Sequence, residues 1–422
     1  MTHTLVAGDR PIPVPPTSDR PADRNGRPRG AAHHTAPDQE RAYLVGVDRG
    51  TRDGGMSMEE SLLELGRLVE TAGGHVVGSM TQRRGHIDPA TYIGSGKVEE
   101  IVAARESTKY TLVVFDDALS PSQQLNLENA LKVKVLDRSA LILDIFASRA
   151  QTREASLQVE LAQHEYLLPR LRGQWQHLER MEGAIGSRGP GETQLETDRR
   201  LIGTRIARLK KQIKTVQQQR ALQRTRRERQ GMPVVALVGY TNAGKSSLMR
   251  ALSGAEVYAA DAVFATLDPV TRRIGSGHAE AFLLTDTVGF MQKLPTQLIS
   301  AFRATLEELR TADLLLHVID GTASAVDAQR ETVEETLGEL GLAGTPVLCV
   351  VNKADGMVLP GGAPVETEGD LALLAAANPL GIATETLYTS ATTGLGIDAL
   401  RRRLLYEFFG SEVSTSTEST AV

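Results

Sequence analysis

A lysine and a serine close a glycine-rich stretch whose spacing is typical of phosphate binding. The stretch is Gly239-Tyr240-Thr241-Asn242-Ala243-Gly244-Lys245-Ser246, in the pattern G-x-x-x-x-G-K-S, between an apolar run and a helical pattern. Glycines let backbone N–H groups approach phosphate oxygens, and the following helix adds its positive N-terminal end. We expect Lys245 to reach the β- and γ-phosphates and the Ser246 hydroxyl to hold Mg²⁺. A chance turn would not need this complete pattern, so the stretch predicts a nucleotide site.

Two later segments are suited to sensing the γ-phosphate and the metal. The first is Phe264-Ala265-Thr266-Leu267-Asp268, in which Thr266 can engage Mg²⁺ and phosphate. The second is Asp286-Thr287-Val288-Gly289, after the apolar run 282–284. Asp286 can contact Mg²⁺ through water and the Gly289 N–H can meet the γ-phosphate, so loss of that phosphate would release both segments. We therefore assign catalysis to Lys245, Thr266 and Gly289, and metal binding to Ser246, Thr266 and Asp286.

Two further loops favour guanine over adenine. Asn352-Lys353-Ala354-Asp355 follows an apolar run, and Asp355 can accept hydrogen bonds from guanine N1–H and N2–H. Adenine would leave that carboxylate unpaired, and sites built on such polar pairing discriminate by roughly 10⁴-fold or more. We expect Lys353 to pack its stem along the base, and Ser390-Ala391 to supply a backbone N–H to guanine O6. Together, in this order at strand ends, the loops predict GTP as the substrate.

The residue after Gly289 bears on the rate of hydrolysis. Many GTPases carry a glutamine there that orients the attacking water, but this chain has Phe290, whose ring cannot do so. We therefore predict slow intrinsic hydrolysis that a partner accelerates. Asn242 suggests a K⁺ ion that acts like an arginine finger, and a structural role for Asn242 is the open alternative.

The elements that position these loops alternate between strands and helices. From 231 to 410 the pattern predicts a P-loop GTPase domain of α/β class. A second set of apolar runs, at 43–47, 76–77, 112–115 and 133–136, predicts a small parallel α/β domain over 41–150. A capping box of Ser57 with Glu60 marks one of its helix starts, and Ser120-Pro121 followed by Gln123 marks another. The stretch 94–97, Gly-Ser-Gly-Lys, is interpreted as a loop before a helix that starts near Lys97 and not as a second phosphate loop.

Between the two α/β patterns, residues 151–230 predict an antiparallel helical hairpin. Two sets of residues repeat in steps of four and three, which is the spacing of a helical seam. The first is Leu157, Leu161, His164, Leu168, Leu171, Trp175 and Leu178, and the second runs from Ile202 to Val216. Pro169 should kink the first arm. The two arms meet at a tip over 183–191 that carries four glycines and Arg188. A plain turn does not need so many glycines, so the tip is a candidate contact site.

The second arm of this hairpin is basic in a chain of net charge −5. A stripe of Lys and Arg side chains in an acidic protein is a candidate contact to a phosphate backbone. A solvated helix face is the competing interpretation. The basic residues are Arg199, Arg200, Arg205, Arg208, Lys210, Lys211, Lys214, Arg220, Arg224, Arg226, Arg227 and Arg229.

Composition excludes several other classes of protein. The chain has 422 residues and a single cysteine, Cys349, in an apolar run where we expect a buried thiol, so no disulfide framework forms within the chain. No apolar stretch reaches the ~18 residues that span a bilayer, and no secretory signal is evident at the N-terminus. We expect a cytoplasmic protein with a disordered leader over 1–40 and a disordered tail over 411–422.

The motifs carry a family resemblance. The five loops resemble those of translation-factor-class GTPases, and IGSRGPGETQLETDRR, from Ile185 to Arg200, resembles the signature of the HflX family, as do 89–97 and 264–268. The resemblance covers about 41–410 and implies a monomeric GTPase that binds the large (50S) ribosomal subunit and its rRNA through the N-terminal domain and hairpin, and that splits stalled or stressed ribosomes. The leader, the tail and an insert over 356–386 depart from it.

Two other functions stay open on the residues alone. One is a GTPase switch that docks the hairpin on a non-ribosomal protein, with hydrolysis as a timer. The other is a GTPase of RNA modification or remodelling. The basic arm and the glycine-rich tip favour RNA, and steep salt dependence of binding would distinguish phosphate contacts from an apolar partner.

Overall fold

The computed structural model describes nine stretches of the chain. They are residues 39–50, 56–171, 190–228, 232–254, 263–264, 266–275, 280–294, 309–382 and 385–410, and within 190–228 it describes side chains only for 196–219. The predicted leader up to residue 38, the glycine-rich tip up to Gly189, Ala265 and the predicted tail 411–422 lie outside the described residues.

The first sheet has four parallel strands in the order β2-β1-β3-β4. Short helices connect the strands, as expected when parallel strands need crossover connections. The elements are β1 (Arg41–Asp48), α1 (Met58–Thr71), β2 (His75–Arg83), α2 (Ser95–Thr108), β3 (Leu112–Phe115), α3 (Pro121–Leu131) and β4 (Lys134–Asp137).

Local signals in the sequence explain where these helices begin. Ser57 and Glu60 form the predicted capping box at α1, and α3 begins after Ser120 as predicted, with Ser120 and Gln123 forming a second capping box. Helix α2 begins at Ser95 with Gly94 as its N-cap, so the predicted helix is present but starts two residues before Lys97, and 95–97 are helical where a loop was expected.

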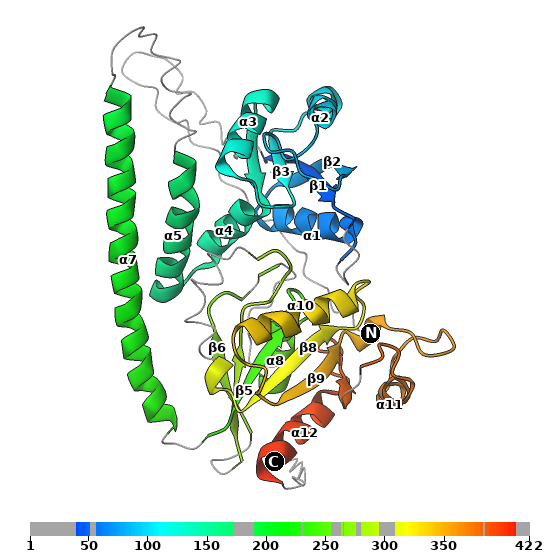
Figure 1. Ribbon diagram of the computed structural model, residues 1–422. Coiled ribbons are helices and arrows are strands. Elements are labelled where there is room, and N and C mark those ends of the chain that lie inside the picture. Colours follow the sequence, from blue (N-terminus) through cyan, green and yellow to red (C-terminus); the bar gives the residue numbers. More distant parts are fainter. Residues whose placement is uncertain are drawn as a thin grey trace, which may run out of the picture. The chain divides into compact units, whose positions relative to one another are not determined.

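Two helices of the middle region lie side by side (Figure 1). They are α5 (Arg153–Leu167) and α7 (Pro190–Glu228), and α4 (Arg138–Arg149) precedes them. Leu161, Leu209 and Ile213 form a small apolar cluster between α5 and α7. Pro169 falls in a 3₁₀ turn, η1 (Leu168–Arg170), so α5 ends at Leu167 where the sequence predicts a kink.

The second sheet has six strands in the order β10-β9-β8-β5-β7-β6. Five strands are parallel, and β6 pairs with β7 in the antiparallel sense, which the sequence pattern did not predict. The strands are β5 (Val234–Gly239), β6 (Val270–Ile274), β7 (Phe282–Asp286), β8 (Leu314–Asp320), β9 (Val347–Asn352) and β10 (Thr386–Tyr388). The helical elements are α8 (Lys245–Ser253), η2 (Leu309–Thr311), α10 (Val326–Glu339), η3 (Ala354–Gly356), α11 (Glu368–Ala377) and α12 (Ile397–Phe409).

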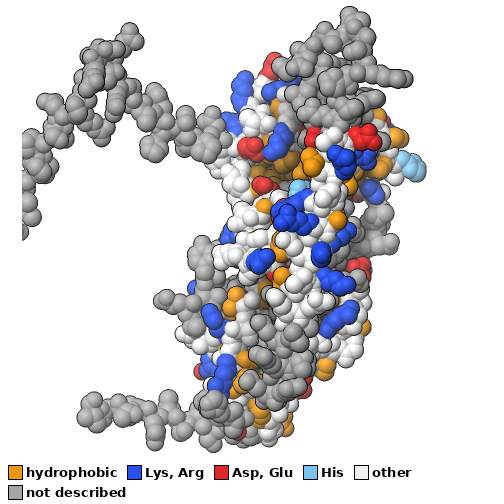
Figure 2. Space-filling view, turned by 90° about the vertical axis from the view of Figure 1, so that its left-hand side faces the viewer, with side chains coloured by type: hydrophobic (Ala, Val, Ile, Leu, Met, Phe, Trp, Pro, Cys, Tyr) orange, Lys and Arg blue, Asp and Glu red, His pale blue; other side chains and the backbone are white. Residues whose placement is uncertain are grey.

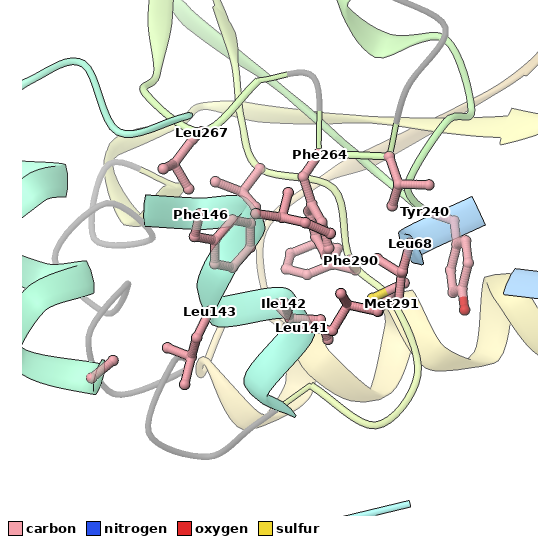
Figure 3. Packing of buried hydrophobic residues seen from close by; sticks show 14 of the residues in the cluster. Leu68, Leu141, Ile142, Leu143, Phe146, Tyr240, Phe264, Leu267, Phe290 and Met291 are labelled. Carbon is pink, nitrogen blue, oxygen red and sulfur yellow. The ribbon is translucent and has the colours of Figure 1, made fainter. Parts of the chain in front are cut away.

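One hydrophobic cluster contains residues from both α/β regions. Phe146 and Ile142 of α4 and Leu68 of α1 belong to it, together with Phe264 and Phe290 from the loops of the second sheet (Figure 3). The two sheets and their connecting helices confirm the predicted α/β fold class with a P-loop domain. Cys349 is buried, as predicted. None of the helices among the described residues combines the length and apolar character that a bilayer-spanning segment needs.

Candidate functional site

The phosphate loop joins β5 to α8, and its two glycines are required by close neighbours. Gly239 has φ +151°, and a Cβ there would lie 2.3 Å from the Val318 carbonyl oxygen. Gly244 has φ +89°, and a Cβ there would lie 2.2 Å from Asn352 Nδ2. Gly244 is also the N-cap of α8 and offers no side chain to bond the first N–H groups of the helix. These N–H groups and the helix dipole are therefore directed at the loop.

Lys245 is buried at the centre of this loop. Its Nζ donates to the Gly239 oxygen at 3.0 Å and to the Tyr240 oxygen at 2.8 Å. Burial lowers the pKa of Lys245 to about 8, although the nearby Asp286 carboxylate acts in the opposite direction. A Cβ at Gly289 would lie 2.9 Å from Nζ, so Gly289 lies directly against the ammonium group.

The three predicted metal ligands converge. Ser246 Oγ donates to Asp286 Oδ2 at 2.6 Å, and Thr266 Oγ1 donates to the same oxygen at 2.9 Å. The two hydroxyl oxygens are 2.7 Å apart. The other carboxylate oxygen, Asp286 Oδ1, is buried and has no hydrogen-bond partner among the described residues. Burial raises the pKa of Asp286. A hard cation with oxygen ligands would satisfy this set.

Asn352 joins the phosphate loop to the predicted guanine loop. Its Nδ2 donates to the Ala243 oxygen at 3.0 Å, and its Oδ1 accepts from the Ala391 N–H at 3.1 Å. Lys353 adopts a left-handed backbone with φ +62° and pairs with Asp320 at 2.7 Å. Asp355 lies exposed in η3, and Ser390 is buried. The structure thus places 239–246, 352–355 and 390–391 at the carboxyl ends of the parallel strands β5, β9 and β10.

Asp268 makes contacts different from those expected of a nucleotide-site residue. Its Oδ2 accepts from the N–H groups of Gln151 and Thr152 at 3.0 Å each, and the Thr152 hydroxyl donates to Oδ1. Its carboxylate therefore lies at the N-terminal end of α5, where negative charge is stabilised by the helix dipole.

Other predicted site residues lie in the protein interior. Thr287 Oγ1 donates to the Leu237 oxygen at 2.6 Å. Phe264, Leu267 and Val288 are buried in the cluster that contains α4. Their side chains therefore serve packing in this structure.

Phe290 is also a packing residue. Its ring lies in the same cluster, close to the side chains of Phe146 and Ile142 (Figure 3). Its backbone is bonded to the phosphate loop, because the Thr241 N–H donates to the Phe290 oxygen at 2.7 Å and the Phe290 N–H donates to the Gly239 oxygen at 3.1 Å. Asn242 has φ +61°, a backbone conformation that asparagine tolerates better than most residues, which gives a conformational reason for its presence.

Helix α1 borders the site, which the sequence did not indicate. A cavity of about 300 Å³ is lined by Tyr240 and Asn242 of the phosphate loop and by Glu60 and Arg67 of α1. Glu60 Oε1 also accepts from Ser324 Oγ at 2.7 Å, after β8. The only sequence signal was the capping box that fixes where α1 begins.

The basic residues of α7 follow its exposed face (Figure 2). Arg205 and Lys210 pair with Glu160 and Glu165 of α5. Among the described side chains of α7, five further basic residues are exposed: Arg199, Arg200, Arg208, Lys211 and Lys214. The side chains from Arg220 onward lie outside the described residues.

Three family models match consecutive parts of the chain. The model described as GTP-binding GTPase N-terminal matches residues 59–147, and the GTP-binding GTPase middle region matches 149–227. The model described as 50S ribosome-binding GTPase matches 234–353. Among solved structures, a GTP-binding protein of Sulfolobus solfataricus in complex with GDP is 25% identical, covers 88% of this chain and 100% of its own, and has a TM-score of 0.44.

Relatives of known name match over most of the chain. GTPase HflX of Caldanaerobacter subterraneus subsp. tengcongensis is 45% identical over 375 residues, which are 89% of this chain and 82% of that relative. GTPase HflX of Escherichia coli (strain K12) is 49% identical over 296 residues, which are 70% of each chain. At this identity and coverage, and with a phosphate loop whose glycines, lysine and serine are all in place, the chain belongs to the HflX family of GTPases.

Proposed function

We propose that this protein binds GTP on the loops 239–246, 264–268, 286–289, 352–355 and 390–391, and that its GTP-bound form associates with the large ribosomal subunit. The close approaches at Gly239 and Gly244 and the buried ammonium of Lys245 support the phosphate end of this site. The bridge that Asn352 makes between Ala243 and Ala391 supports the base end.

The ligand set at Ser246, Thr266 and Asp286 fits Mg²⁺. The donors are hydroxyl and carboxylate oxygens, and the buried Asp286 Oδ1 has no hydrogen-bond partner among the described residues, so this oxygen could accept from a water bound to the metal. Bound Mg²⁺ would neutralise charge that develops on the phosphates. Lys245 would hold the β- and γ-phosphates, and the Gly289 N–H would orient the γ-phosphate.

The chain's own residues suggest a slow intrinsic reaction. Phe290 stands where a water-orienting glutamine is often found, and its ring is buried in the cluster with α4. We propose that the ribosomal subunit supplies the group that orients the attacking water. A K⁺ ion at Asn242 is a further proposal, and equal rates of hydrolysis in K⁺ and Na⁺ would contradict it.

Base recognition offers a direct test of the guanine site. Asp355→Asn replaces a carboxylate that accepts two N–H groups with an amide that also donates. Xanthine carries an oxygen in place of the guanine N2 amine, so the variant should lose affinity for GTP and gain affinity for XTP, each by about tenfold or more. Unchanged preference for GTP would remove Asp355 from the site.

The proposed partner rests on one structural observation and on the family. The observation is that Arg199, Arg200, Arg208, Lys211 and Lys214 are all exposed on α7, which suits a phosphate backbone. The family model over 234–353 is described as a 50S ribosome-binding GTPase. We propose that N-terminal domain and hairpin contact rRNA and that binding splits stalled or stressed ribosomes into subunits.

Splitting is tested by incubating intact ribosomes with the protein and a non-hydrolysable GTP analogue, and separating the products on a sucrose gradient. We expect free subunits with the analogue and intact ribosomes with GDP. Lys245→Ala, which removes the phosphate ligand, is the control. Intact ribosomes in both nucleotide states would contradict the splitting activity.

A further inference from the structure

The segment after β7, residues 289–293, contacts the phosphate loop and is hydrogen-bonded to it. Gly289 lies against Lys245 Nζ, and a Cβ there would be 2.8 Å from Thr241 Cα and 2.9 Å from Nζ. Phe290 exchanges two backbone hydrogen bonds with Gly239 and Thr241, at 3.1 Å and 2.7 Å. A phosphate oxygen that reaches Lys245 Nζ must therefore enter beside Gly289. The space available for a third phosphate depends on where residues 289–293 lie.

Lys293 connects the same segment to the N-terminal sheet through ion pairs. Its ammonium group pairs with Asp116, at the end of β3, and with Asp117 Oδ1 at 2.8 Å. Lys293 adopts a left-handed backbone with φ +56°, which non-glycine residues hold only when their surroundings determine it. The Asp116 side chain is fully buried, whereas 35% of the Lys293 side chain is exposed. Lys293 thus reaches from the surface into a buried acidic site.

Without Lys293, the acidic site would hold more buried carboxylates than buried cations. Arg138, at the start of α4, is buried and pairs with Asp116 at 2.5 Å and with Glu64 of α1 at 2.6 Å. Two buried carboxylates therefore share one guanidinium. A buried charge without a partner is unfavourable, so the cluster of Asp116, Arg138 and Glu64 is a site for a second cation.

The acidic cluster also borders the phosphate loop. The Tyr240 hydroxyl accepts from the Gln292 N–H at 3.0 Å, and Tyr240 and Glu64 line the same cavity. Ion pairs therefore connect Glu64 through Arg138 and Asp116 to Lys293. Glu64 lies on the cavity next to Tyr240 of the phosphate loop, and Lys293 lies in the segment that follows Gly289.

We propose that the Asp116–Arg138–Glu64 cluster is a positioning site for Lys293 and that its occupation favours the arrangement in which Gly289 rests against Lys245. The inference rests on the phosphate position proposed above. GDP lacks the third phosphate and leaves this arrangement unchanged, whereas GTP must move Gly289 away from Lys245 Nζ before the Gly289 N–H can donate to the third phosphate. A ligand shifts an equilibrium only by its differential affinity for the two arrangements, so weakening the Lys293 contact favours GTP over GDP.

Lys293→Met tests this in the full chain, with GDP and a non-hydrolysable GTP analogue titrated in the presence of Mg²⁺. Methionine keeps the length of the side chain and removes its charge. We expect affinity for the analogue to rise about fivefold, with GDP affinity within about twofold of wild type. Lys293→Arg keeps a cation and should restore the wild-type ratio of the two affinities.

Lys97→Met is the matched control. Lys97 also pairs with a carboxylate, Glu100 at 2.5 Å, and 30% of its side chain is exposed, but it lies in α2 and touches none of these residues. An unchanged ratio in Lys293→Met, an equal change for both nucleotides, or the same change in Lys97→Met would overturn the inference. A wild-type chain that binds neither nucleotide would contradict the proposed nucleotide site itself, and this inference with it.

Discussion

The rings of Phe146 and Phe264 pack edge to face with their centroids 4.5 Å apart and an interplanar angle of 67°. Phe146 lies in α4, and Phe264 opens the segment that carries Thr266. Near them, Asp268 accepts hydrogen bonds at the N-terminal end of α5. The segment that carries one predicted metal ligand is therefore attached to the N-terminal half of the chain by an apolar contact and a polar one.

Phe146→Ala should lower the free energy of unfolding by about 3–5 kcal/mol, because the ring is buried and its removal leaves a cavity beside Phe264. Urea unfolding measures this. Tyr406→Ala on the exposed face of α12 is the control and should change stability by no more than about 0.5 kcal/mol. Equal effects of the two substitutions would mean that the interface between α4 and Phe264 does not form in solution.

Arg138→Met should destabilise the protein by about 3–5 kcal/mol, because it leaves Asp116 and Glu64 buried without their shared partner. Arg403→Met removes a guanidinium that pairs with Glu407 at the surface of α12 and should cost no more than about 1 kcal/mol. Both values come from the same denaturant titration. A small effect of Arg138→Met would show that the cluster is solvated in solution.

The same cluster should shape stability at acid pH. Burial alone would raise the pKa of Asp116, but the charges of Arg138 and Lys293 outweigh it and hold the pKa below its ordinary value of 3.8. The unfolded chain therefore binds more protons between the two pKa values. The contribution of Asp116 is complete above 3.8 and is lost as the pH falls through the folded-state pKa. Asp116→Asn should show a shallower loss of stability over that range, and parallel curves for the two proteins would contradict this.

Nucleotide affinity should fall at alkaline pH. Burial lowers the pKa of Lys245 to about 8, so the free protein loses its phosphate-binding cation above that pH. Between pH 7.5 and 9 the affinity for GTP should decrease roughly tenfold. The guanidinium of Lys245→Arg stays charged, so this variant should lack the dependence even if its affinity is lower. A pH-independent affinity of the wild type over this range would contradict the role of Lys245.

Large-subunit binding should depend steeply on salt through α7. Replacing Arg208, Lys211 and Lys214 with alanine removes three exposed cations and should reduce the slope of log K against log salt by about two to three units. Replacing Arg401, Arg402 and Arg403 on α12 makes the same charge change on a different helix and should leave the slope unaltered. Identical slopes for the wild type and the α7 variant would exclude α7 from the contact.

Features that depend on residues close together in the sequence were predicted best. The spacing of Gly239, Gly244 and Lys245 specifies the phosphate loop, and two capping boxes specify the starts of α1 and α3. The antiparallel pairing of β6 was missed because only residues 275–281 separate β6 from β7, and a strand in a short hairpin does not alternate with a helix.

Contacts between distant parts of the chain were not predicted. Asp268 was assigned to the nucleotide site, yet its carboxylate contacts Thr152, which is 116 residues away. Lys293 and Asp116 are 177 residues apart. Hydrophobic periodicity does not indicate which charged side chains from two α/β regions will meet. The one available signal was Arg138, a charged residue between a buried strand and an apolar helix, where a charge needs a partner.

The central claim is that the GTP form of this protein binds the large ribosomal subunit, and co-sedimentation with separated subunits tests it most directly. The protein is pelleted with each subunit in the presence of a non-hydrolysable GTP analogue or GDP. We predict strong pelleting with the large subunit and the analogue, and weak pelleting with GDP. Failure to pellet in either state, by a protein that binds GTP normally, would contradict the ribosomal function.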